Sequence, residues 1–489
     1  MHIFLRNHDF FHATNSVLQI FFSNVRFTNL KEIDLFKGYD FLILVDYVEN
    51  LNSFETSVIV ENNVVTKVTE MCKDTNVKHW LKISMYKCLC LYTNKVPKWG
   101  ILTGIRPTKK IYKYIDVISD EKIVDMLSEK YLVDKEKARL TIEVARNEQK
   151  VLHRLDENGA HIYISIPFCI SRCVYCSFTS FSYQKYDKLG LVDKYVDCLI
   201  KELKESAYLF KDKKIVTVYV GGGTPTTLSA TNIEKMLKAI VENYDLSHLL
   251  EFTYEAGRAD TFTRDKLVVL KNFGVNRISI NPQSMKQETL HAINRTHSIE
   301  EFMWAYDLAR EFKFPIINVD IIFGLAGENF QDFSNTLKKV LDLNPECVTI
   351  HTLAVKKGSA LKEFYQSDEI FASISKKEIS NLPLSMLVDK YYIPYYLYRQ
   401  KNMVGNSSLE NIGYSKPGCE CIYNIISMEE TENIIGFGAG AVTKRIFSDN
   451  TIDRAFNVSN IHDYVERTDE MIERKVELYT REILKMEED

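Results

Sequence analysis

The middle of the chain alternates short apolar runs with longer amphipathic stretches. The apolar runs are rich in β-branched residues and read as strands at residues 162–168, 217–220, 252–254, 277–280, 318–323 and 348–353. Between them, apolar residues three and four apart predict helices at residues 191–210, 233–243, 264–272, 300–312 and 333–341. About six β/α units in succession predict a parallel sheet, open or curled as part of a barrel. Reactive groups in such folds lie beyond the carboxyl ends of the strands.

The two flanks have other patterns. Strand-like runs at 41–48 and 57–68 indicate a small α/β region, and Cys88 and Cys90 alternate along an apolar run that also fits a strand. A charged helical pattern covers 120–156. After Val355 an aromatic, basic and glycine-containing region precedes a charged helix at about 463–487. Residues 98–109 are turn-rich and basic, and they fit a packed connector as well as a functional loop.

These patterns predict an α/β protein in four parts. They are an N-terminal α/β extension (1–95), a basic turn segment with a helical connector (96–160), a β/α partial barrel (161–355) and a mixed α/β C-terminal domain (356–489).

The composition excludes several classes of protein. The chain has 489 residues, 45% hydrophobic and 26% charged, which is enough to bury a sizeable core. Its formal net charge of −4 leaves no surplus of cations for a dedicated nucleic-acid binder. No apolar run approaches the ~20 residues of a membrane helix, and the start lacks a signal-peptide pattern. We therefore expect a soluble, cytoplasmic protein that binds neither membrane nor nucleic acid, with its cysteines reduced.

Three cysteines follow the first predicted strand of the repeat. Cys169, Cys173 and Cys176 have the spacing Cys-x3-Cys-x2-Cys. Three thiolates on one tight loop can hold three corners of a [4Fe–4S] cube and leave the fourth iron open. A structural zinc site needs four closed ligands, and this loop offers no fourth Cys or His. The pattern therefore favours a cluster that binds and activates a ligand.

A glycine run follows the second strand. Gly221, Gly222 and Gly223 precede Thr224, so the backbone there can approach a ligand closely and aim N–H groups at a carboxylate. Glu255 ends the third strand, where it could accept from a hydroxyl or amine of a ligand.

A second set of polar residues comes from the later strands. Asp320 lies inside an apolar strand, where an unpaired carboxylate is costly, so we expect a fixed partner, with Arg295 as the candidate. A structural buried pair is the alternative. His297 and His351 read as structural residues.

The cysteine spacing, placed after the first strand of a β/α repeat, resembles the signature of radical S-adenosylmethionine (SAM) enzymes, and Gly222-Gly223-Thr224-Pro225 resembles their GGTP motif. The resemblance implies a partial (β/α)6 radical SAM barrel. It also implies that the methionyl group of SAM chelates the open iron, and that one electron from the cluster cleaves the sulfonium to a 5′-deoxyadenosyl radical.

Residues 163–442 together resemble the oxygen-independent coproporphyrinogen III oxidase family, and most closely its coproporphyrinogen dehydrogenase branch of the HemZ type. The features of that branch are the long N-terminal extension, Leu102-Thr103-Gly104-Ile105-Arg106-Pro107-Thr108-Lys109, Ile280-Asn281-Pro282-Gln283 and the run from Tyr396 to Met403.

The family holds two SAM molecules side by side. By resemblance, the cluster-bound molecule contacts Tyr163, Gly222, Glu255 and Val442. The second molecule contacts Tyr175, Gly223, Thr224, Gln283, Arg295, Asp320 and Ala354.

The implied reaction is oxidative decarboxylation of two propionates of coproporphyrinogen III to vinyl groups, which gives protoporphyrinogen IX. Tyr396, Tyr398, Arg399 and Lys401 could offer such a tetrapyrrole flat faces and cations. An ordinary solvated surface is the alternative for these four residues. The resemblance also implies a low-potential electron donor such as flavodoxin or ferredoxin, and we expect a monomer.

One departure from the family pattern keeps other functions open. The oxidases carry a further cysteine in a Cys-Gly-Cys ending, whereas this chain has Cys176-Ser177-Phe178. That ending resembles the haem-chaperone branch, which binds haem without decarboxylating it. A radical haem-modifying methyltransferase is the third alternative.

Overall fold

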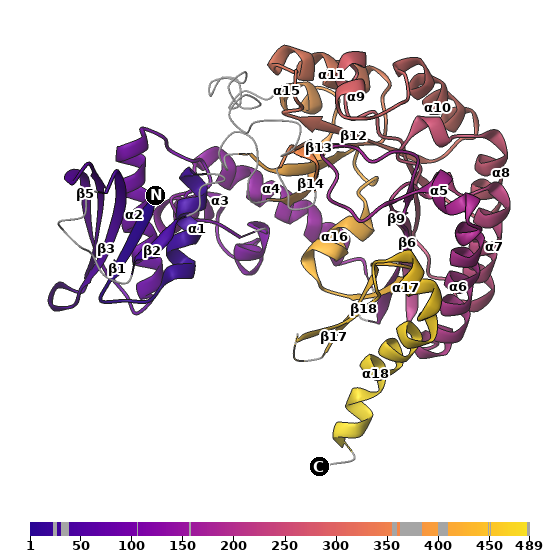
Figure 1. The fold of residues 1–489 in the computed structure, drawn as a ribbon, viewed down its shortest axis with the longest axis horizontal. Coiled ribbons are helices and arrows are strands. Elements are labelled where there is room, and N and C mark those ends of the chain that lie inside the picture. The colour runs from indigo at the N-terminus through magenta and orange to yellow at the C-terminus, as the bar shows by residue number, and fades with distance from the viewer. Residues whose placement is uncertain are drawn as a thin grey trace. The chain divides into compact units, whose positions relative to one another are not determined.

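The computed structural model describes residues 1–22, 27–30, 39–104, 106–155, 158–354, 359–361, 384–399, 409–447, 449 and 451–486 (Figure 1). The chain divides into two compact units. Unit 1 comprises Met1–Arg146 with Leu397–Asn411, and unit 2 comprises Asn147–Tyr396 with Ile412–Asp489. The boundaries expected at 95, 160 and 355 stay a prediction.

Unit 2 contains the predicted barrel. Its parallel strands are β6 (Gly159–Ile166), β9 (Lys214–Gly222), β10 (Glu251–Glu255), β11 (Arg277–Ser279), β12 (Ile316–Phe323) and β13 (Cys347–Thr352). They are neighbours in this order, and every adjacent pair is parallel. The predicted α/β fold class is thereby confirmed, and the six parallel strands in sequence order agree with a partial (β/α)6 barrel.

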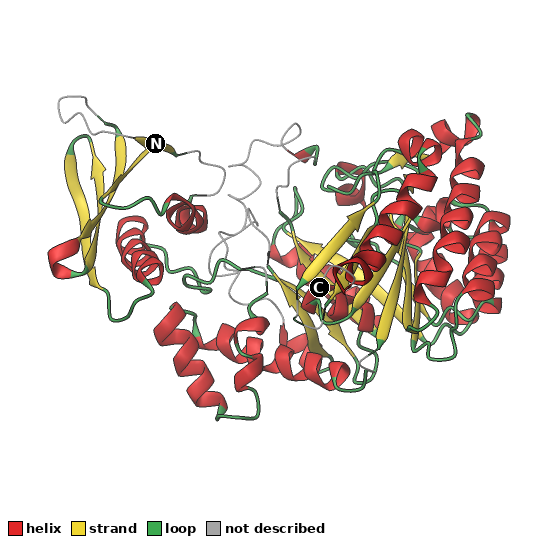
Figure 2. Ribbon diagram, turned by 90° about the horizontal axis from the view of Figure 1, so that it is seen from below, coloured by secondary structure: helices red, strands yellow, loops and turns green. Residues whose placement is uncertain are grey.

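Helices cover the outer side of this sheet (Figures 1 and 2). They are α6 (Leu191–Ser206), α7 (Ala230–Asn243), α8 (Arg264–Asn272), α9 (Gln287–Ala292), α10 (Ile299–Glu311) and α11 (Phe330–Asp342). In α7 the buried apolar residues Ile233, Met236, Leu237 and Ile240 are spaced for one helical face. Polar caps fix where α10 and α11 begin, because Ser298 and Asn329 accept the first free N–H groups.

C-terminal strands extend both edges of the barrel sheet. β16 (Asn433–Phe437) pairs in parallel with β6 and continues into the antiparallel strands β17 (Val442–Ile446) and β18 (Ile452–Phe456). At the other edge β15 (Asn411–Ser415) lies antiparallel to β13, followed by β14 (Ile393–Tyr398). The helix α16 (Ile422–Glu429) connects β15 to β16. The C-terminal region is therefore mixed α/β, and its strands extend the barrel sheet at both edges.

A buried glutamate ties the C-terminal helices to the barrel. The side chain of Glu202 on α6 is 0% exposed. Its carboxylate accepts hydrogen bonds from the backbone N–H of Gly438 (2.9 Å), from Asn457 (2.7 Å) and from Tyr464 (2.5 Å). Lys475, also 0% exposed, completes the group as its ion-pair partner. One carboxylate thus links α6, the loop after β16, and the helices α17 (Ile461–Glu466) and α18 (Thr468–Met486).

Unit 1 has its own sheet. Its strands are β1 (His2–Arg6), β2 (Thr28–Leu30), β3 (Phe41–Val48), β4 (Ser53–Val60) and β5 (Asn63–Met71), in the order β2-β1-β3-β4-β5. Its main helices are α1 (Phe11–Phe21), α2 (Val77–Thr93), α3 (Asp120–Tyr131) and the first part of α4 (Lys135–Leu152). The packing of α2 on β4 and β5 buries Leu81, Met85, Cys88 and Leu89.

Several local predictions were wrong. The run at 57–68 is a hairpin of β4 and β5, because Glu61 and Asn62 both adopt positive φ and reverse the chain. Cys88 and Cys90 lie on the helix α2, whose period is hidden by an almost unbroken apolar run. The helical pattern predicted at 120–156, by contrast, is confirmed and forms two helices, since Leu132 ends α3 in a left-handed conformation. The C-terminal helix is likewise divided at Arg467, between α17 and α18.

Part of the basic turn segment is packed inside unit 1. Trp99 is 1% exposed, and its indole N–H donates to Glu410 (2.9 Å). Gly100 has φ +52°, and a Cβ there would lie 2.1 Å from the carbonyl oxygen of Tyr131. These contacts support the connector interpretation for the start of the segment. Ile105 lies outside the described residues.

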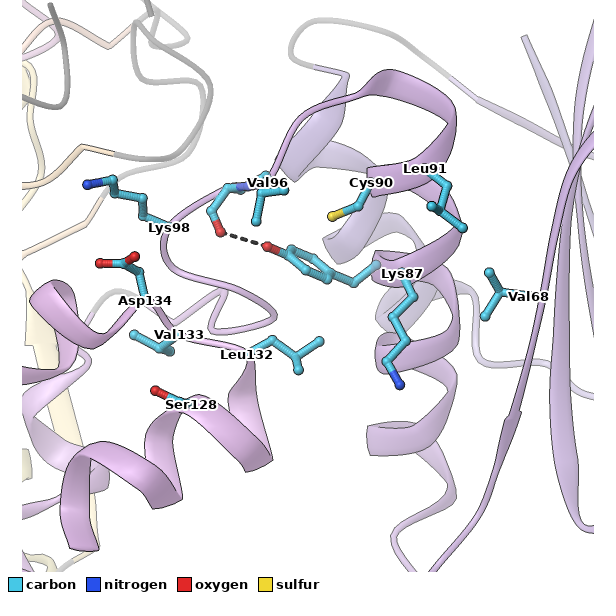
Figure 3. A pocket seen from close by; sticks show the side chains of 12 residues that line it. Val68, Lys87, Cys90, Leu91, Val96, Lys98, Ser128, Leu132, Val133 and Asp134 are labelled. Atoms are coloured by element: carbon cyan, nitrogen blue, oxygen red, sulfur yellow. Dashed lines mark hydrogen bonds between the residues drawn. The ribbon is translucent and has the colours of Figure 1, made fainter. Parts of the chain in front are cut away.

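A cavity of about 610 Å³ lies in unit 1, between α2, β5 and the chain around 96–98 and 128–134 (Figure 3). Three of its polar side chains have partners: Tyr86 donates to the Pro97 carbonyl, Lys87 pairs with Glu70, and Lys98 pairs with Glu136. The Ser128 hydroxyl is buried without a hydrogen-bond partner among the described residues. The remaining lining is mostly aliphatic, so the cavity presents no cluster of reactive groups.

No helix in the described part of the chain combines the length and the apolar character that a membrane span requires.

Candidate functional site

The cysteine loop begins directly after β6. Cys169 lies on the short strand β7 (Phe168–Cys169), which pairs with β8 (Phe181–Ser182). The loop then turns, and the N–H of Cys176 donates to the carbonyl of Cys173 (3.0 Å). Cys173 is buried, while Cys169 and Cys176 are partly buried. The structure thus places the three predicted ligands on one short segment that follows the carboxyl end of β6.

Hydrogen-bond donors surround two of the sulfurs. The Thr224 hydroxyl lies 3.5 Å from the Cys169 sulfur, to which Ser180 also donates. The backbone N–H of Phe178 donates to the Cys176 sulfur. Burial raises the pKa of both thiols, these bonds lower it, and repulsion among the three thiolates raises it again. Three neighbouring sulfurs, two of which accept hydrogen bonds, fit a positively charged iron centre.

The spacing does not fit a mononuclear metal. Within the described ranges, no three His, Cys, Asp or Glu side chains are close enough to hold one metal ion. In a [4Fe–4S] cube each thiolate binds a different iron, so the sulfurs need not share one. Three cysteines on one loop, without a fourth Cys or a His on that loop, are the donor set expected for a cube with one open iron.

The glycine run is packed against the cysteine strand. The N–H of Gly223 donates to the Ile166 carbonyl (2.8 Å), and that of Thr224 donates to the Phe168 carbonyl (2.7 Å). Gly222 has φ +105°. A Cβ on Gly223 would lie 2.6 Å from the Phe168 carbonyl oxygen, so no larger residue fits without a backbone shift. The predicted cradle for a ligand therefore lies beside Cys169.

Three tyrosines stack beside the cradle. Tyr163 on β6 lies 6.2 Å from Tyr219 on β9, with the rings inclined by 27°. Tyr423 on α16 lies 4.4 Å from Tyr219 and 5.9 Å from Tyr163. Tyr163 was predicted, whereas Tyr219 and Tyr423 were missed. Tyr219 precedes the glycine run by two positions, and that alternation could have indicated an inward-facing side chain.

Glu255 lies next to this stack and is partly buried. The Tyr219 hydroxyl donates to its carboxylate. Burial raises the pKa of Glu255 to about 7, with repulsion from Asp320 adding to the increase and the Tyr219 hydrogen bond opposing it. Folding therefore favours the protonated form of this carboxyl in the absence of a ligand.

We expect this shift to make stability pH-dependent. The folded-state pKa of Glu255 is above its ordinary value, so its contribution is complete below about pH 4.5 and is lost as pH rises through 7. From pH 5 to 8 the unfolding free energy of the ligand-free protein should fall by up to about 3 kcal/mol more than that of Glu255→Gln. Urea unfolding at both pH values measures this. Glu234→Gln, on the exposed side of α7, should follow the wild type, and equal pH slopes for wild type and Glu255→Gln would contradict the shift.

Gln283 and Arg295 form a second polar region. Gln283 has φ 68°, and its N–H donates to the Asp320 carbonyl (3.1 Å). Arg295, 3% exposed, donates to the Tyr175 hydroxyl (3.0 Å) and to the Gly257 carbonyl (2.7 Å). Within the described residues, Oε1 of Gln283 and Nε of Arg295 are buried without a hydrogen-bond partner. Such orphaned polar atoms fit a polar ligand.

The predicted partner of Asp320 was wrong. Its carboxylate lies 3.7 Å from Nε2 of His351 and accepts a hydrogen bond from Asn318 (2.7 Å), while Arg295 bonds elsewhere. Burial raises the pKa of Asp320. The hydrogen bonds and charge of His351, Asn318 and Thr349 lower it by more, so the net shift is downward. Asp320 is thus held as a carboxylate by a histidine that lies one strand away, on β13.

The remaining cofactor candidates lie at strand ends. Ala354 is 5% exposed and follows β13. Val442 begins β17, next to a loop whose Gly438 packs on the carbonyl of Ser165 in β6. Burial lowers the pKa of His297 to about 3, and both of its ring nitrogens are buried without a partner among the described residues, so its structural role stays a prediction.

The predicted substrate residues are divided between the units. In unit 2 Tyr396 stacks 6.2 Å from Tyr395. In unit 1 Arg399 is 7% exposed, lies 4.9 Å over the Trp99 ring, and donates to the Leu102 carbonyl. Burial lowers its pKa to about 10. Tyr398 belongs to unit 1, and Lys401 lies outside the described residues. Substrate binding by these four residues stays a prediction.

Comparisons with known proteins agree with this geometry. Residues 163–340 match the model of the Radical SAM superfamily. The oxygen-independent coproporphyrinogen-III oxidase-like protein HemZ of Bacillus subtilis is 38% identical over 84% of this chain and 82% of its own length. The heme chaperone HemW of the same organism is 28% identical over 57% of this chain and 69% of its own.

A solved structure supports the fold. The coproporphyrinogen III oxidase HemN of Escherichia coli, described as a radical SAM enzyme, superimposes with a TM-score of 0.51 at 22% identity, over 67% of this chain and 73% of its own. Radical SAM proteins use a [4Fe–4S] cluster and S-adenosylmethionine. With the HemZ similarity extending over most of both chains, this chain belongs to the oxygen-independent coproporphyrinogen-III oxidase-like family of radical SAM proteins.

Proposed function

We propose that the chain is a radical SAM enzyme that decarboxylates two propionates of coproporphyrinogen III to vinyl groups under low oxygen. Cys169, Cys173 and Cys176 would hold the cluster, which together with SAM supplies one-electron radical chemistry when bound. Each propionate would lose a β-hydrogen atom and CO2, and one further electron would pass to a one-electron acceptor, which has to be present as a co-substrate.

The observation that carries the cofactor site is a pair of buried polar atoms that have no partner in the described structure. Oε1 of Gln283 and Nε of Arg295 are buried without partners in the described structure, and Gly223 leaves room for no side chain. A ligand with carboxylate, amine and ribose groups, such as SAM, can satisfy both atoms. Two SAM molecules are part of the proposal.

The chain's own residues would position these groups. Gly222 and Gly223 carry no side chain, so a ligand can approach the backbone closely; Tyr163 offers an aromatic face, and the partly buried carboxyl of Glu255 can accept from a ligand hydroxyl or amine. Arg295 and Asp320 supply opposite charges on the other side of the strand ends. This arrangement holds a polar nucleotide and restricts water around it.

The substrate assignment depends on the extent of the similarity. The 38% identity to HemZ covers 84% of the chain, whereas the HemW similarity covers 57%. HemZ is named only as an oxidase-like protein. The decarboxylation of coproporphyrinogen III by this chain is therefore a proposal. Tyr163, Tyr219 and Tyr423 offer flat aromatic faces that suit a planar ring system.

A haem chaperone on the same scaffold is the second candidate. The sequence Cys176-Ser177-Phe178 lacks the further cysteine of the oxidase ending, and HemW proteins are among the relatives. In that case the cluster and SAM site would be retained, but haem would be bound and delivered without decarboxylation.

Anaerobic turnover separates these candidates. The reconstituted protein is supplied with dithionite, SAM and coproporphyrinogen III, and the products are followed by chromatography. We expect protoporphyrinogen IX together with 5′-deoxyadenosine. Stoichiometric haem binding without turnover would favour the chaperone, and a methylated or opened haem would favour the haem-modifying methyltransferase. Cys198→Ser, which changes a thiol on α6 outside the loop, should turn over like the wild type.

A further inference from the structure

Arg258 is a buried cation beside the cysteine loop. It lies three residues after β10, at the carboxyl end of the barrel strands, and it is 3% exposed. Burying a guanidinium is costly unless its charge is paired and its N–H groups have acceptors. The proposed cofactor and substrate contacts do not include this residue, so its burial beside the loop has a separate explanation.

Every N–H group of the Arg258 side chain has an acceptor. One terminal nitrogen donates to the hydroxyl (2.7 Å) and to the carbonyl (3.3 Å) of Ser171. Nε (3.0 Å) and the other terminal nitrogen (2.7 Å) donate to the carboxylate of Asp260. That second terminal nitrogen also donates to the Thr296 hydroxyl (2.8 Å). These bonds use all the donors of a guanidinium, in an arrangement that a lysine ammonium cannot reproduce.

The guanidinium is bonded to the middle of the cysteine loop, because Ser171 lies midway between the first two cysteines. The Ser171 hydroxyl donates in turn to the carbonyl of Asn294 (2.9 Å), whose side-chain amide donates to the Arg172 carbonyl (2.9 Å). The N–H of Val174 donates to the Ile293 carbonyl (3.2 Å). The loop is thus joined to the segments that follow β10 and α9 by one network of hydrogen bonds.

The charge of Arg258 is close to the proposed cluster ligands. Its bonded partner Ser171 is two residues from Cys169 and two from Cys173. Burial raises the pKa of the Cys169 thiol, and the positive charge of Arg258 lowers it. Reduction adds one negative charge to an iron–sulfur cluster, so a buried cation beside its ligands favours the reduced form.

We propose that Arg258 is a positioning residue that holds the cysteine loop through Ser171, and that its charge raises the reduction potential of the proposed cluster. The proposal rests on the proposed radical SAM function, which requires a cluster that accepts one electron. Asp260 acts in the opposite direction on the potential, because its carboxylate lies 2.7 Å from the guanidinium and offsets its charge.

The first test measures the reduction potential of the reconstituted protein at equilibrium with methyl viologen. Reduced viologen gives one electron to the cluster and is oxidised, and no bond is made or broken. In Arg258→Gln we expect the equilibrium constant for cluster reduction to fall by about tenfold, or about 59 mV for a one-electron couple. In Asp260→Asn it should rise by about as much, because the cation loses its counter-charge. A role in packing alone would not move the two variants in opposite directions.

Amide hydrogen exchange of the cluster-free protein tests the positioning role separately. In Arg258→Gln the amides of Val174 and Cys176, which are hydrogen-bonded in the wild type, should exchange about tenfold faster or more. Arg258→Lys keeps the charge but loses the planar fork, so these amides should still exchange faster while the potential matches the wild type. The control is Arg310→Gln. It breaks a pair with Glu346 (2.9 Å), which precedes β13 at the amino end of the strands, and should change neither measurement.

The outcomes separate the two proposals. Equal potentials in the wild type, Arg258→Gln and Asp260→Asn, or shifts in the same direction, would overturn the role of the charge, while uptake of the cluster would still support the proposed function. Unchanged exchange in Arg258→Gln would overturn the positioning role. If Arg258→Gln takes up no cluster, Asp260→Asn decides, because an unchanged or lowered potential there would overturn the proposal. A wild type that takes up no cluster would instead refute the proposed function, and hydrogen exchange would still decide the positioning role.

Discussion

Replacing Cys169 with serine is expected to abolish SAM cleavage, because one corner of the proposed cluster loses its thiolate. The variant should retain little iron and sulfide after anaerobic reconstitution, and 5′-deoxyadenosine should fall to background. A serine oxygen is a poor substitute for the soft sulfur that iron–sulfur clusters require. Iron and sulfide assays, the visible absorbance and chromatography of nucleosides measure the three effects.

The control for this prediction is a cysteine outside the loop. Cys198 on α6 is partly buried, and its sulfur lies 3.7 Å from the carbonyl of Val465. Cys198→Ser should keep its iron and its SAM cleavage. Full iron content in Cys169→Ser, or equal iron loss in both variants, would contradict the assignment of the cysteine loop.

The sequence was informative where apolar periodicity is strong. All six barrel strands were predicted, because each is a short apolar run bounded by a turn and an amphipathic helix. Secondary structure was predicted wrongly where apolar residues follow one another with few polar interruptions. In α2 the apolar run around Cys88 hides the helical period, and at Glu61-Asn62 two polar residues in a strand-like run turned out to be a hairpin.

Only part of the candidate site could be predicted from the sequence. Motifs on one loop, such as the three cysteines and Gly222-Gly223-Thr224, are visible because their residues are adjacent in sequence. Contacts between distant strands are not visible. Asp320 was expected to pair with Arg295, but the register of β12 and β13 sets it opposite Thr349, and His351, two residues further along β13, lies 3.7 Å from its carboxylate.

Buried networks between remote segments were missed altogether. Glu202 is one of several acids on an amphipathic helix, and nothing in its neighbourhood distinguishes it from a solvated residue. Its partners come from positions 438, 457, 464 and 475. Only the addition of β16 to the edge of β6 brings these segments over α6. The C-terminal region thus contributes to the stability of the loop that precedes Val442.

Lys475→Met is therefore expected to lower the unfolding free energy by about 3–5 kcal/mol, the usual cost of leaving one charge of a buried pair without its partner. Both side chains are fully buried, and Glu202 would keep its bonds from Asn457 and Tyr464 but lose its counter-ion. Urea denaturation followed by circular dichroism measures the loss. The double variant Glu202→Gln/Lys475→Met removes both charges and should recover part of it. A loss below about 1 kcal/mol in Lys475→Met, or a double variant that is no more stable than the single one, would show that the pair does not stabilise the fold.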